Sequence, residues 1–568
     1  MAVALRVLSW GAVDADSPLP TGRAEDRPLN VLFVVADDLG VDNVGVYGEH
    51  PDPARTPNID QLATDGLLFR RAYANPVCSP SRATLLTGRY AWRNGLGMAL
   101  SPWSSDRLPI TEKTLATLLA PTHRTAAVGK WHLGVDPAHP AQMGFDHHRG
   151  TLNNISSFMG GTYDDYEKNV DGVAVRSTTY ATTDTVDDAL ALIQQFGSDP
   201  WFLWVAFNAA HTPLHKPPAA LHGYTLPAAV EGNEPIHSKA MIEALDTELG
   251  RLLASLDPLT RANTLIVFIS DNGPVSETVT APWDPGKAKT TVFELGVRVP
   301  LVIAGPGVPA GLECEGLVNT TDLFATVLEA VGVPHPAPED AVSLAPYFVD
   351  PTQPSLREHV YVESFSPNAG DVFDARRIAV RGERFKLIQR FLPGESGAPR
   401  EEFYDLLNDP YETVDLIEVP PTPEVSQAYL ELRAVLAAQG PPAVDVPWAT
   451  LGGGTQGALG PLTLSGNGLL QPGTPAGIEL RNAQPHALCL ATIALSPVPI
   501  LLNGGGFSAT PATVHQLFLA DAQGTFAPQG PWPPGFPSGT GLWIQCLASD
   551  PSVFWGVTLS NAIKATTP

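Results

Sequence analysis

Residues 30–38, N-V-L-F-V-V-A-D-D, decide the fold class of this 568-residue chain. The uninterrupted apolar run from Val31 to Val35 fits a strand that is covered on both faces, as strands of a parallel sheet are. Two carboxylates, Asp37 and Asp38, follow this run directly. Open α/β sheets bind their ligands at the carboxyl ends of their strands. The stretch therefore predicts a buried strand that delivers two acidic side chains to a site.

The same pattern, a short apolar run followed by a helical stretch, recurs as far as about residue 304 and predicts an α/β domain with a mostly parallel sheet. The clearest strand candidates are Val31–Val35, Thr125–Val128, Trp201–Phe207, Leu265–Ile269 and Val299–Ile303. Thr56 followed by Pro57 predicts the start of a helix. The buried stripe expected for this helix comprises Ile59, Leu62, Ala63 and Gly66.

The rest of the chain divides by composition. A small α+β unit is predicted from strands at Arg377–Arg381 and Phe385–Arg390 and a helix at Pro423–Ala438. A proline-rich linker precedes an all-β tail, whose predicted strands include Ile478–Leu480, Leu488–Ala494 and Gly541–Cys546. The expected organisation is a tail at 1–28, an α/β domain at 29–345, the α+β subdomain at 346–440, a linker at 441–450 and the β domain at 451–568.

Charge and composition exclude several classes of function. The 34 Lys and Arg residues against 59 Asp and Glu residues give a net charge of −25, which disfavours nucleic acid and anionic membrane surfaces as partners. No apolar run reaches the roughly 18 residues of a membrane-spanning helix. The first 16 residues make a poor signal peptide. Of the four cysteines, Cys489 and Cys546 share the β tail and could form a disulfide.

A second strand, T-L-I-V-F-I, runs into Ser270, Asp271, Asn272 and Gly273 just as the first runs into its two acids. Two strands thus bring three carboxylates and an amide to one edge of the sheet. Such oxygen ligands suit Ca²⁺ or Mg²⁺ better than Zn²⁺. Either acidic pair alone would more often be a helix cap or a solvated turn, and only the two together favour a metal site.

Basic residues follow two other strands. Lys130 and His132 come after one, in T-A-A-V-G-K-W-H, and His211 comes after W-F-L-W-V-A-F. Lys130 and His132 would share a face if the strand geometry continued through them. A histidine beside a lysine near a metal suits proton transfer and anion binding. His139, His147, His148 and His215 are expected to be structural.

The most specific segment is C-S-P-S-R at residues 78–82, followed by A-T-L-L-T-G-R at 83–89. It resembles the signature of the type I sulfatases, in which the cysteine is converted to formylglycine. Further segments before and after it appear in the family's order: V-A-D-D, T-P-N-I-D-Q-L-A, G-K-W-H-L-G, H-T-P-L, S-D-N-G and G-V-R-V-P, and then R-I-A-V-R-G-E-R-F-K-L-I and F-Y-D-L-L-N-D-P-Y-E-T. The resemblance covers about residues 29–440 and implies an alkaline-phosphatase-like α/β fold.

The resemblance also implies roles for individual residues. The implied metal ligands are Asp37, Asp38, Asp271, Asn272 and an oxygen of the modified Cys78. Arg82 would orient the modified side chain, and Lys289 would hold the sulfate. Leu295 replaces the first glycine of the family's usual E-G-G motif, which follows the sulfate-binding lysine. Because of this departure, Lys287 is kept as the alternative to Lys289 in the alignment with the family.

In the implied chemistry, a hydrated aldehyde has two hydroxyl groups on one carbon, so that one attacks sulfur and the other later expels the sulfate. The metal would lower the pKa of the attacking hydroxyl group and polarise the sulfate oxygens. His211 and Lys289 would stabilise and protonate the departing alkoxide. His132 would take the proton from the remaining hydroxyl, and Lys130 would contribute positive charge to the site.

The resulting expectation is a sulfatase acting on an aryl or carbohydrate sulfate ester. The segment G-L-G-M-A-L-S-P-W-S-S-D-R-L-P resembles arylsulfatase B-like members and suggests a carbohydrate. One alternative is a phosphate or phosphonate ester hydrolase of the same superfamily, and another is a non-catalytic binding protein in which Cys78 stays unconverted. The family implies a transient partner, the formylglycine-generating enzyme, and a periplasmic or extracellular location.

Overall fold

The computed structural model describes residues 28–155, 161–335, 339–368, 375–391 and 399–439, together with separate stretches between 448 and 566. The expected N-terminal tail up to residue 27 and linker residues 441–447 lie outside the described residues, so the signal-peptide interpretation stays untested. Among the described helices, none combines the length and the apolar character needed to cross a bilayer.

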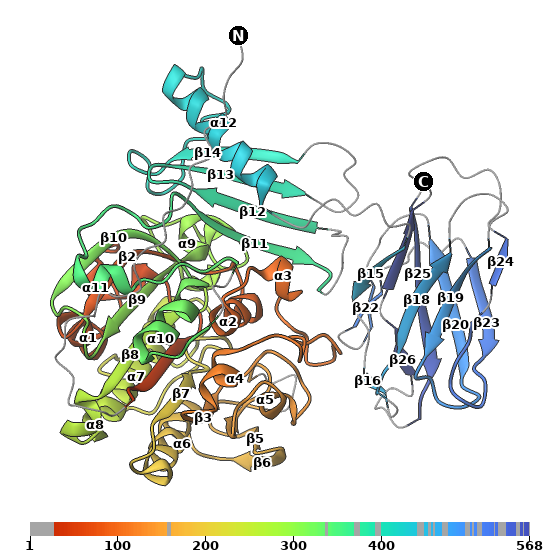
Figure 1. Ribbon diagram of the computed structural model, residues 1–568, viewed down its shortest axis with the longest axis horizontal. Coiled ribbons are helices and arrows are strands. Elements are labelled where there is room, and N and C mark those ends of the chain that lie inside the picture. The colour runs from red at the N-terminus through yellow and green to blue at the C-terminus, as the bar shows by residue number, and fades with distance from the viewer. Residues whose placement is uncertain are drawn as a thin grey trace.

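A ten-stranded sheet forms the centre of the α/β domain (Figure 1). Its spatial order is β10-β2-β9-β8-β1-β7-β3-β4-β5-β6. The strands are β1 (Asn30–Ala36), β2 (Leu67–Tyr73), β3 (Arg124–Gly129), β4 (His147–Gly150), β5 (Tyr166–Val170), β6 (Val173–Ser177), β7 (Trp201–Ala206), β8 (Thr264–Ser270), β9 (Arg298–Ala304) and β10 (Leu312–Asn319). The five predicted strands are confirmed as β1, β3, β7, β8 and β9.

The sheet is mostly parallel, as predicted, but strand β9 departs from this pattern. Strand β1 pairs in parallel with β7 and β8, as expected, but β9 runs antiparallel to both of its neighbours, β8 and β2. The reason lies in the connection that precedes it. Residues 271–297 remain at the carboxyl edge of the sheet, so the chain re-enters the sheet from that edge and must run in the opposite direction.

Helices cover both faces of the sheet. The helices of the α/β domain are α1 (Pro57–Thr64), α2 (Cys78–Thr87), α3 (Ala91–Asn94), α4 (Leu115–Leu119), α5 (His139–Gln142), α6 (Ala181–Phe196), α7 (Glu234–Ser255), α8 (Pro258–Ala262), α9 (Glu294–Val297), α10 (Asp322–Val331) and α11 (Ala345–Val349). Because successive strand residues point to opposite faces, Val31, Phe33 and Val35 pack with α2, α4 and α10, whereas Leu32 and Val34 pack with α1, α6 and α7.

Helix α1 begins at Pro57, as the sequence predicts, and Ile59, Leu62 and Ala63 are buried. Gly66 does not belong to this stripe. It lies beyond the helix end, just before β2, and a Cβ added there would lie 2.4 Å from the carbonyl oxygen of Ile303. Glycine at this position permits close approach of two backbones rather than helix packing.

The smaller unit is an antiparallel sheet in the order β11-β12-β13-β14, followed by a helix. Its elements are β11 (Val360–Ser366), β12 (Ala375–Arg381), β13 (Phe385–Phe391), β14 (Arg400–Asp405) and α12 (Pro423–Ala438), which confirms the predicted strands and helix. Leu432 and Leu436 of α12 pack on one face of the sheet. Val360 and Ile388 share a core with Val292 of the α/β domain, so the unit is fixed to that domain by a continuous apolar contact.

The described part of the tail consists of β-strands and turns, as predicted, and lies beside the larger domain (Figure 1). The strands are β15 (Trp448–Gly452), β16 (Gln456–Gly457), β17 (Gly460–Pro461), β18 (Thr463–Gly468), β19 (Pro475–Arg481), β20 (Leu488–Ala494), β21 (Ile500–Leu502), β22 (Gly505–Phe507), β23 (Val514–Leu519), β24 (Gln529–Pro531), β25 (Gly541–Ser549), β26 (Val557–Leu559) and β27 (Ala562–Thr566).

The suggested disulfide in the tail is wrong, because Cys489 and Cys546 are both buried free thiols. In the antiparallel pair β20–β25, Cys489 lies opposite Ala548 and Cys546 lies opposite Ala491. The two cysteines are therefore diagonal neighbours. Such neighbours are roughly 7–8 Å apart, beyond the usual Cα separation of a disulfide.

Gly129 ends β3 directly before Lys130 and has φ +83, and a Cβ there would lie 1.9 Å from the carbonyl oxygen of Ala206. Gly172 has φ +92 with open space around it. We expect Gly172→Ala to lower the free energy of unfolding by about 1–2 kcal/mol, the cost of left-handed backbone for alanine. Gly129→Ala should cost about 1–3 kcal/mol more, through steric overlap. Urea unfolding measures both; equal losses would contradict the close packing described here.

Candidate active site

The ends of β1 and β8 lie side by side, because Ala36 is in register with Ser270. Asp37 and Asp38 therefore meet Asp271 and Asn272, and all four residues are at most 3% exposed. The backbone N–H of Asp38 donates to Asp271 Oδ1 at 3.3 Å, and Asn272 Nδ2 donates to Asp38 Oδ1 at 2.7 Å. The predicted convergence of two strand ends is thus present in the structure.

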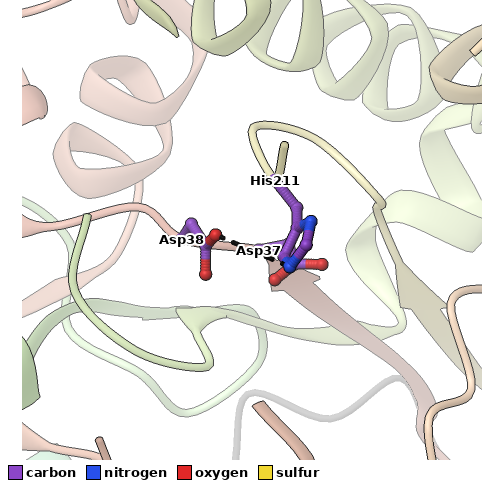
Figure 2. A group of neighbouring side chains, drawn as sticks. All are labelled: Asp37, Asp38 and His211. Carbon is purple, nitrogen blue, oxygen red and sulfur yellow. Dashed lines mark ion pairs between the residues drawn. The ribbon is translucent and has the colours of Figure 1, made fainter. Parts of the chain in front are cut away.

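Three oxygens of this group are buried and have no hydrogen-bond partner: Asp37 Oδ1, Asp38 Oδ2 and Asn272 Oδ1. Buried oxygens without a partner are costly. A hard divalent cation would satisfy all three, so the donor set fits Ca²⁺ or Mg²⁺. Donor atoms of Asp37, Asp38 and His211 also lie within 4.8 Å of one another (Figure 2). The oxygens remain the better ligand set for a hard ion, because Ca²⁺ and Mg²⁺ prefer carboxylate and amide oxygens to an imidazole nitrogen.

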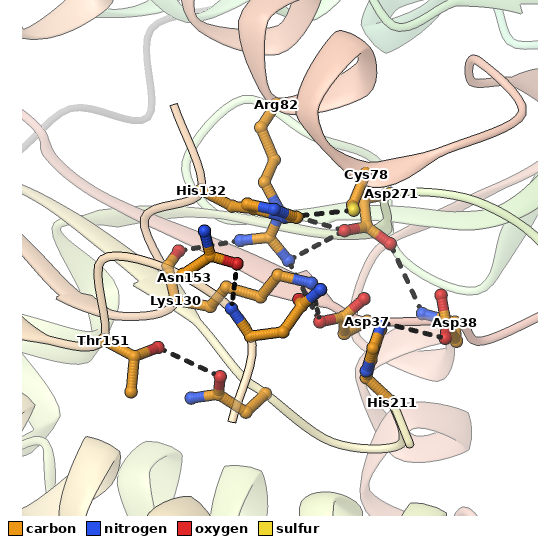
Figure 3. Close-up of polar contacts among 12 residues, drawn as sticks. Asp37, Asp38, Cys78, Arg82, Lys130, His132, Thr151, Asn153, His211 and Asp271 are labelled. Atoms are coloured by element: carbon orange, nitrogen blue, oxygen red, sulfur yellow. Dashed lines mark hydrogen bonds and ion pairs between the residues drawn. The ribbon is translucent and has the colours of Figure 1, made fainter. Parts of the chain in front are cut away.

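The side chain of Arg82 is fully buried and points toward this group (Figure 3). Its Nε atom donates to Asp271 Oδ2 at 2.9 Å, and its Nη2 atom forms an ion pair with the same oxygen at 2.8 Å. Nη1 donates to the carbonyl oxygen of Lys130 at 2.7 Å. Burial opposes its charge, but Asp271 and Asp37 raise the pKa of Arg82 above its usual value. The guanidinium therefore ties the start of α2 to the ends of β3 and β8.

Lys130 and His132 both reach the site, but not as residues of a continuing strand. Strand β3 ends at Gly129, and His132 has φ +56. The expectation that both side chains share one strand face is therefore wrong. Instead the backbone turns after Gly129, and Lys130 Nζ reaches Asp37 Oδ2 at 2.5 Å.

Cys78, the first residue of α2, is 1% exposed, and its Sγ is 3.1 Å from His132 Nδ1. The other ring nitrogen of His132, Nε2, is 2.9 Å from the carbonyl oxygen of Leu100. Because a carbonyl can only accept, Nε2 carries the proton and Nδ1 presents its lone pair to residue 78. Burial raises the pKa of the Cys78 thiol, and burial with Lys130 lowers that of His132 well below its ordinary value.

His211 follows β7 on a loop that is bonded to the end of β1. Asp37 N–H donates to Ala209 O at 3.0 Å, and the Tyr163 hydroxyl contacts the carbonyl oxygens of Asn208 at 2.5 Å and His211 at 2.8 Å. The pKa of His211 is lowered to about 3 by burial and by Lys130 and Lys289. Tyr163 carries no sequence signal that would have identified it.

Lys289 rather than Lys287 reaches the site. Lys289 Nζ lies 2.5 Å from Asp38 Oδ1, and Asp38 raises its pKa against the opposing effect of burial. Lys287 Nζ instead donates to the carbonyl oxygens of Tyr411 and Glu412. Geometry therefore selects Lys289 from the two alternatives.

Other polar groups near the site were not singled out from the sequence. Thr151 donates to Asn208 Oδ1 at 3.1 Å, and Asn153 lies close to His132 in Figure 3. Asn153 and Asn154 help line a cavity of about 390 Å³ that extends to Lys168 and Arg176. Among the described residues, several between Asn153 and Asn169 thus border this cavity. His139, in contrast, accepts from Trp131 Nε1 at 3.1 Å within the core, as expected of a structural histidine.

Comparison with known protein families gives two adjoining matches. The Sulfatase family model matches residues 29–333, and the model for the C-terminal region of N-sulphoglucosamine sulphohydrolase matches residues 287–438. Together they cover the α/β domain and the α+β subdomain. The β tail lies outside both matches.

Individual relatives that match this chain are also named as sulfatases. N-acetylgalactosamine-6-sulfatase of Sus scrofa is 34% identical over 361 residues, which are 56% of this chain and 66% of that protein. Arylsulfatase A of Homo sapiens is 30% identical over 472 residues, covering 74% of this chain and 90% of that protein. The crystal structure of Ps i-CgsB, solved with k-i-k-neocarrahexaose, has a TM-score of 0.61 at 27% identity, covering 72% of this chain and 92% of that one.

The unpartnered oxygens predict stabilisation by a divalent cation. At a free Ca²⁺ or Mg²⁺ concentration 100 times the Kd, the free energy of unfolding should rise by about 2.7 kcal/mol, and a chelator should reverse the rise. Asp37→Asn and Asn272→Leu should abolish the effect, while Asp257→Asn, an exposed cap of α8, should retain it. Thermal unfolding with and without cation tests this; equal shifts in all variants would contradict a metal site here.

Proposed function

Because this chain belongs to the sulfatase family, we propose that it hydrolyses a carbohydrate sulfate monoester with residue 78, in its formylglycine form, as the nucleophile. One observation carries the proposal. The side chain of residue 78 lies 3.1 Å from His132 Nδ1, the ring nitrogen that bears a lone pair. The same side chain also lies beside the oxygen cluster of Asp37, Asp38 and Asp271 (Figure 3). A nucleophile, a base and a cation site therefore meet at one point.

Two groups absent from the polypeptide would supply part of the chemistry. A divalent ion held by Asp37, Asp38, Asp271 and Asn272 would supply Lewis acidity toward the sulfate oxygens and the nucleophile. The formylglycine hydrate would supply the attacking hydroxyl. Conversion of Cys78 requires the formylglycine-generating enzyme as a transient partner.

His132 supports residue 78 as a base. Its Nε2 proton is committed to the carbonyl of Leu100, so Nδ1 can accept a proton from a hydroxyl on residue 78. Arg82 opposes the rise that burial causes in the pKa of Asp271, and it orients that carboxylate through one hydrogen bond and one ion pair to Oδ2. These two residues act on the nucleophile side of the sulfate.

Lys289, Lys130 and His211 act on the substrate side. The two ammonium groups lie beside Asp38 and Asp37 and would bind the anionic oxygens of the ester. The Nδ1 atom of His211 is 2.6 Å from the carbonyl of Thr212, which leaves Nε2 to face the site and to protonate the departing alkoxide. Bound sulfate would offset the nearby ammonium groups and thereby favour the protonated imidazole.

A carbohydrate leaving group is supported by the relatives and by the cavity near the site. The pig relative is named for N-acetylgalactosamine, and Ps i-CgsB was solved with a neocarrahexaose. The cavity of about 390 Å³ beside Asn153 falls within the size range of ligand sites. We also propose that the protein is located in the periplasm or outside the cell. We further propose that residues 29–345, 346–440 and 451–568 form separate domains.

Conversion of Cys78 predicts a mass change. The peptide containing residue 78 should be lighter by about 18 Da than its sequence mass, because the thiol becomes an aldehyde. Peptide mapping of the protein made together with a formylglycine-generating enzyme measures this change. Peptides containing Cys314 serve as the control and should keep their sequence mass. A free thiol at Cys78 under these conditions would favour the non-catalytic binding protein.

Activity distinguishes the sulfatase from the phosphate or phosphonate ester hydrolase. The converted enzyme should hydrolyse an aryl sulfate faster than the matching aryl phosphate and should prefer members of a sulfated-glycan panel over both. Cys78→Ala should reduce kcat at least about 10³-fold, because it removes the nucleophile. Lys289→Met should lower kcat/KM about 10²–10³-fold, as loss of one oxyanion-stabilising group does. A faster phosphate reaction would reject the proposed function.

A further inference from the structure

The segment D-P-Y-E-T at residues 409–413 has no part in the chemistry above, yet its turn is unusually well bonded. It follows β14 in the α+β subdomain. Glu412 is 2% exposed and has φ +56, a backbone conformation that few residues other than glycine adopt. Such a buried acid in an unfavourable backbone conformation needs compensating contacts, and these contacts lead to the segment that carries Lys289.

The first contact joins Glu412 to the start of α9, five residues after Lys289. Glu412 Oε2 accepts from the backbone N–H of Glu294 at 2.6 Å. Lys386 Nζ, 1% exposed, lies 3.0 Å from Glu412 Oε1 and 3.0 Å from Glu294 Oε1. The Tyr73 hydroxyl donates to the other oxygen of Glu294 at 3.0 Å. Removing one member would leave a buried charge without its partner, so the cluster holds its geometry firmly.

The second contact lies two residues before Lys289. Lys287 Nζ donates to the carbonyl oxygen of Tyr411 at 3.0 Å and to that of Glu412. The Tyr411 ring also meets Trp283 edge-on, with ring centroids 4.8 Å apart. A single turn of the α+β subdomain therefore contacts the segment on both sides of Lys289, at Lys287 and at Glu294.

Between the two contacts, backbone bonds fix the segment to the strand ends of the site. Lys289 N–H donates to Pro274 O at 2.9 Å, and Thr290 N–H donates to Pro76 O at 2.9 Å. The Lys289 side chain then reaches Asp38 Oδ1. Displacing a catalytic group by about 1 Å can cost 10²-fold in rate, so holding this segment matters for the reaction.

We propose that Glu412 is a positioning residue, which holds Lys289 where its ammonium group meets the substrate sulfate. The inference rests on the proposed function, because it assigns the consequence of the contact to sulfate binding by Lys289. It makes the α+β subdomain a working part of the active site, although none of that subdomain's residues needs to touch the substrate.

The test is a double-mutant cycle between Glu412 and Lys289 on the converted enzyme with an aryl sulfate. Glu412→Ala should lower kcat/KM about 10–100-fold through displacement of Lys289. Glu412→Gln, which can still accept from the Glu294 N–H, should stay within about threefold of wild type. In a Lys289→Met background, Glu412→Ala should change kcat/KM less than about twofold, because its effect passes through the missing lysine.

A matched control and a second variant keep the result interpretable. Glu424→Gln breaks an exposed ion pair to Arg384 in the same subdomain and should leave kcat/KM unchanged. Lys287→Met removes the second contact, from Lys287 Nζ to the 411–412 carbonyl oxygens, without disturbing the buried carboxylates. Its effect on kcat/KM should also disappear in the Lys289→Met background. Lys287→Met takes the place of Glu412→Ala in the double-mutant cycle if Glu412→Ala does not fold. Equal losses with and without Lys289 would overturn the proposal and leave Glu412 a purely structural residue.

Binding of inorganic sulfate, measured calorimetrically, separates this inference from the proposed function. Glu412→Ala should weaken sulfate binding, but by no more than Lys289→Met does, and the double variant should bind no more weakly than Lys289→Met alone. An inactive wild type that still shows this pattern would refute the proposed hydrolysis but support the positioning role. Unchanged sulfate affinity in Glu412→Ala would overturn the positioning role even in an active enzyme.

Discussion

Burial of three carboxylates at the end of a sheet is the constraint on which the rest of the structure depends. Each carboxylate has a cationic partner from a different part of the chain, because an unpaired buried charge would cost several kcal/mol. The pairs are Asp37 with Lys130, Asp38 with Lys289 and Asp271 with Arg82. Folding the sheet therefore requires β3, α2 and the segment before β9 to arrive at the same place.

This requirement explains several features that otherwise look unrelated. The turn after Gly129 directs Lys130 inward at the cost of a backbone that only glycine tolerates there. The connection before β9 stays at the carboxyl edge to place Lys289, and it thereby reverses the direction of β9. The α+β subdomain packs against that connection through the core that includes Val292 and Ile388. Each feature keeps a cation within reach of its carboxylate.

Local pattern was sufficient to predict the strands and the acids that follow them, since Val31–Val35 and Leu265–Ile269 are buried runs whose ends are marked by Asp37 and Asp271. Pattern could not predict the turn that the backbone makes after Gly129, because the close approach of Gly129 to Ala206 arises only when β3 and β7 pair. The choice between Lys287 and Lys289 likewise depends on a turn more than 120 residues away. Tertiary contacts of this kind leave no periodic signal in the sequence.

The cation cluster also resolves a conflict between the net charge and an anionic substrate. A chain with a net charge of −25 repels a sulfate ester at long range, but salt screens exposed charges beyond roughly 8 Å at physiological ionic strength. Lys130, Lys289 and Arg82 are largely buried and lie within one small volume, so their attraction is screened much less. Affinity for sulfate is therefore set by these few groups and their placement rather than by the charge of the protein. That is why a residue as remote in sequence as Glu412 can matter to the chemistry.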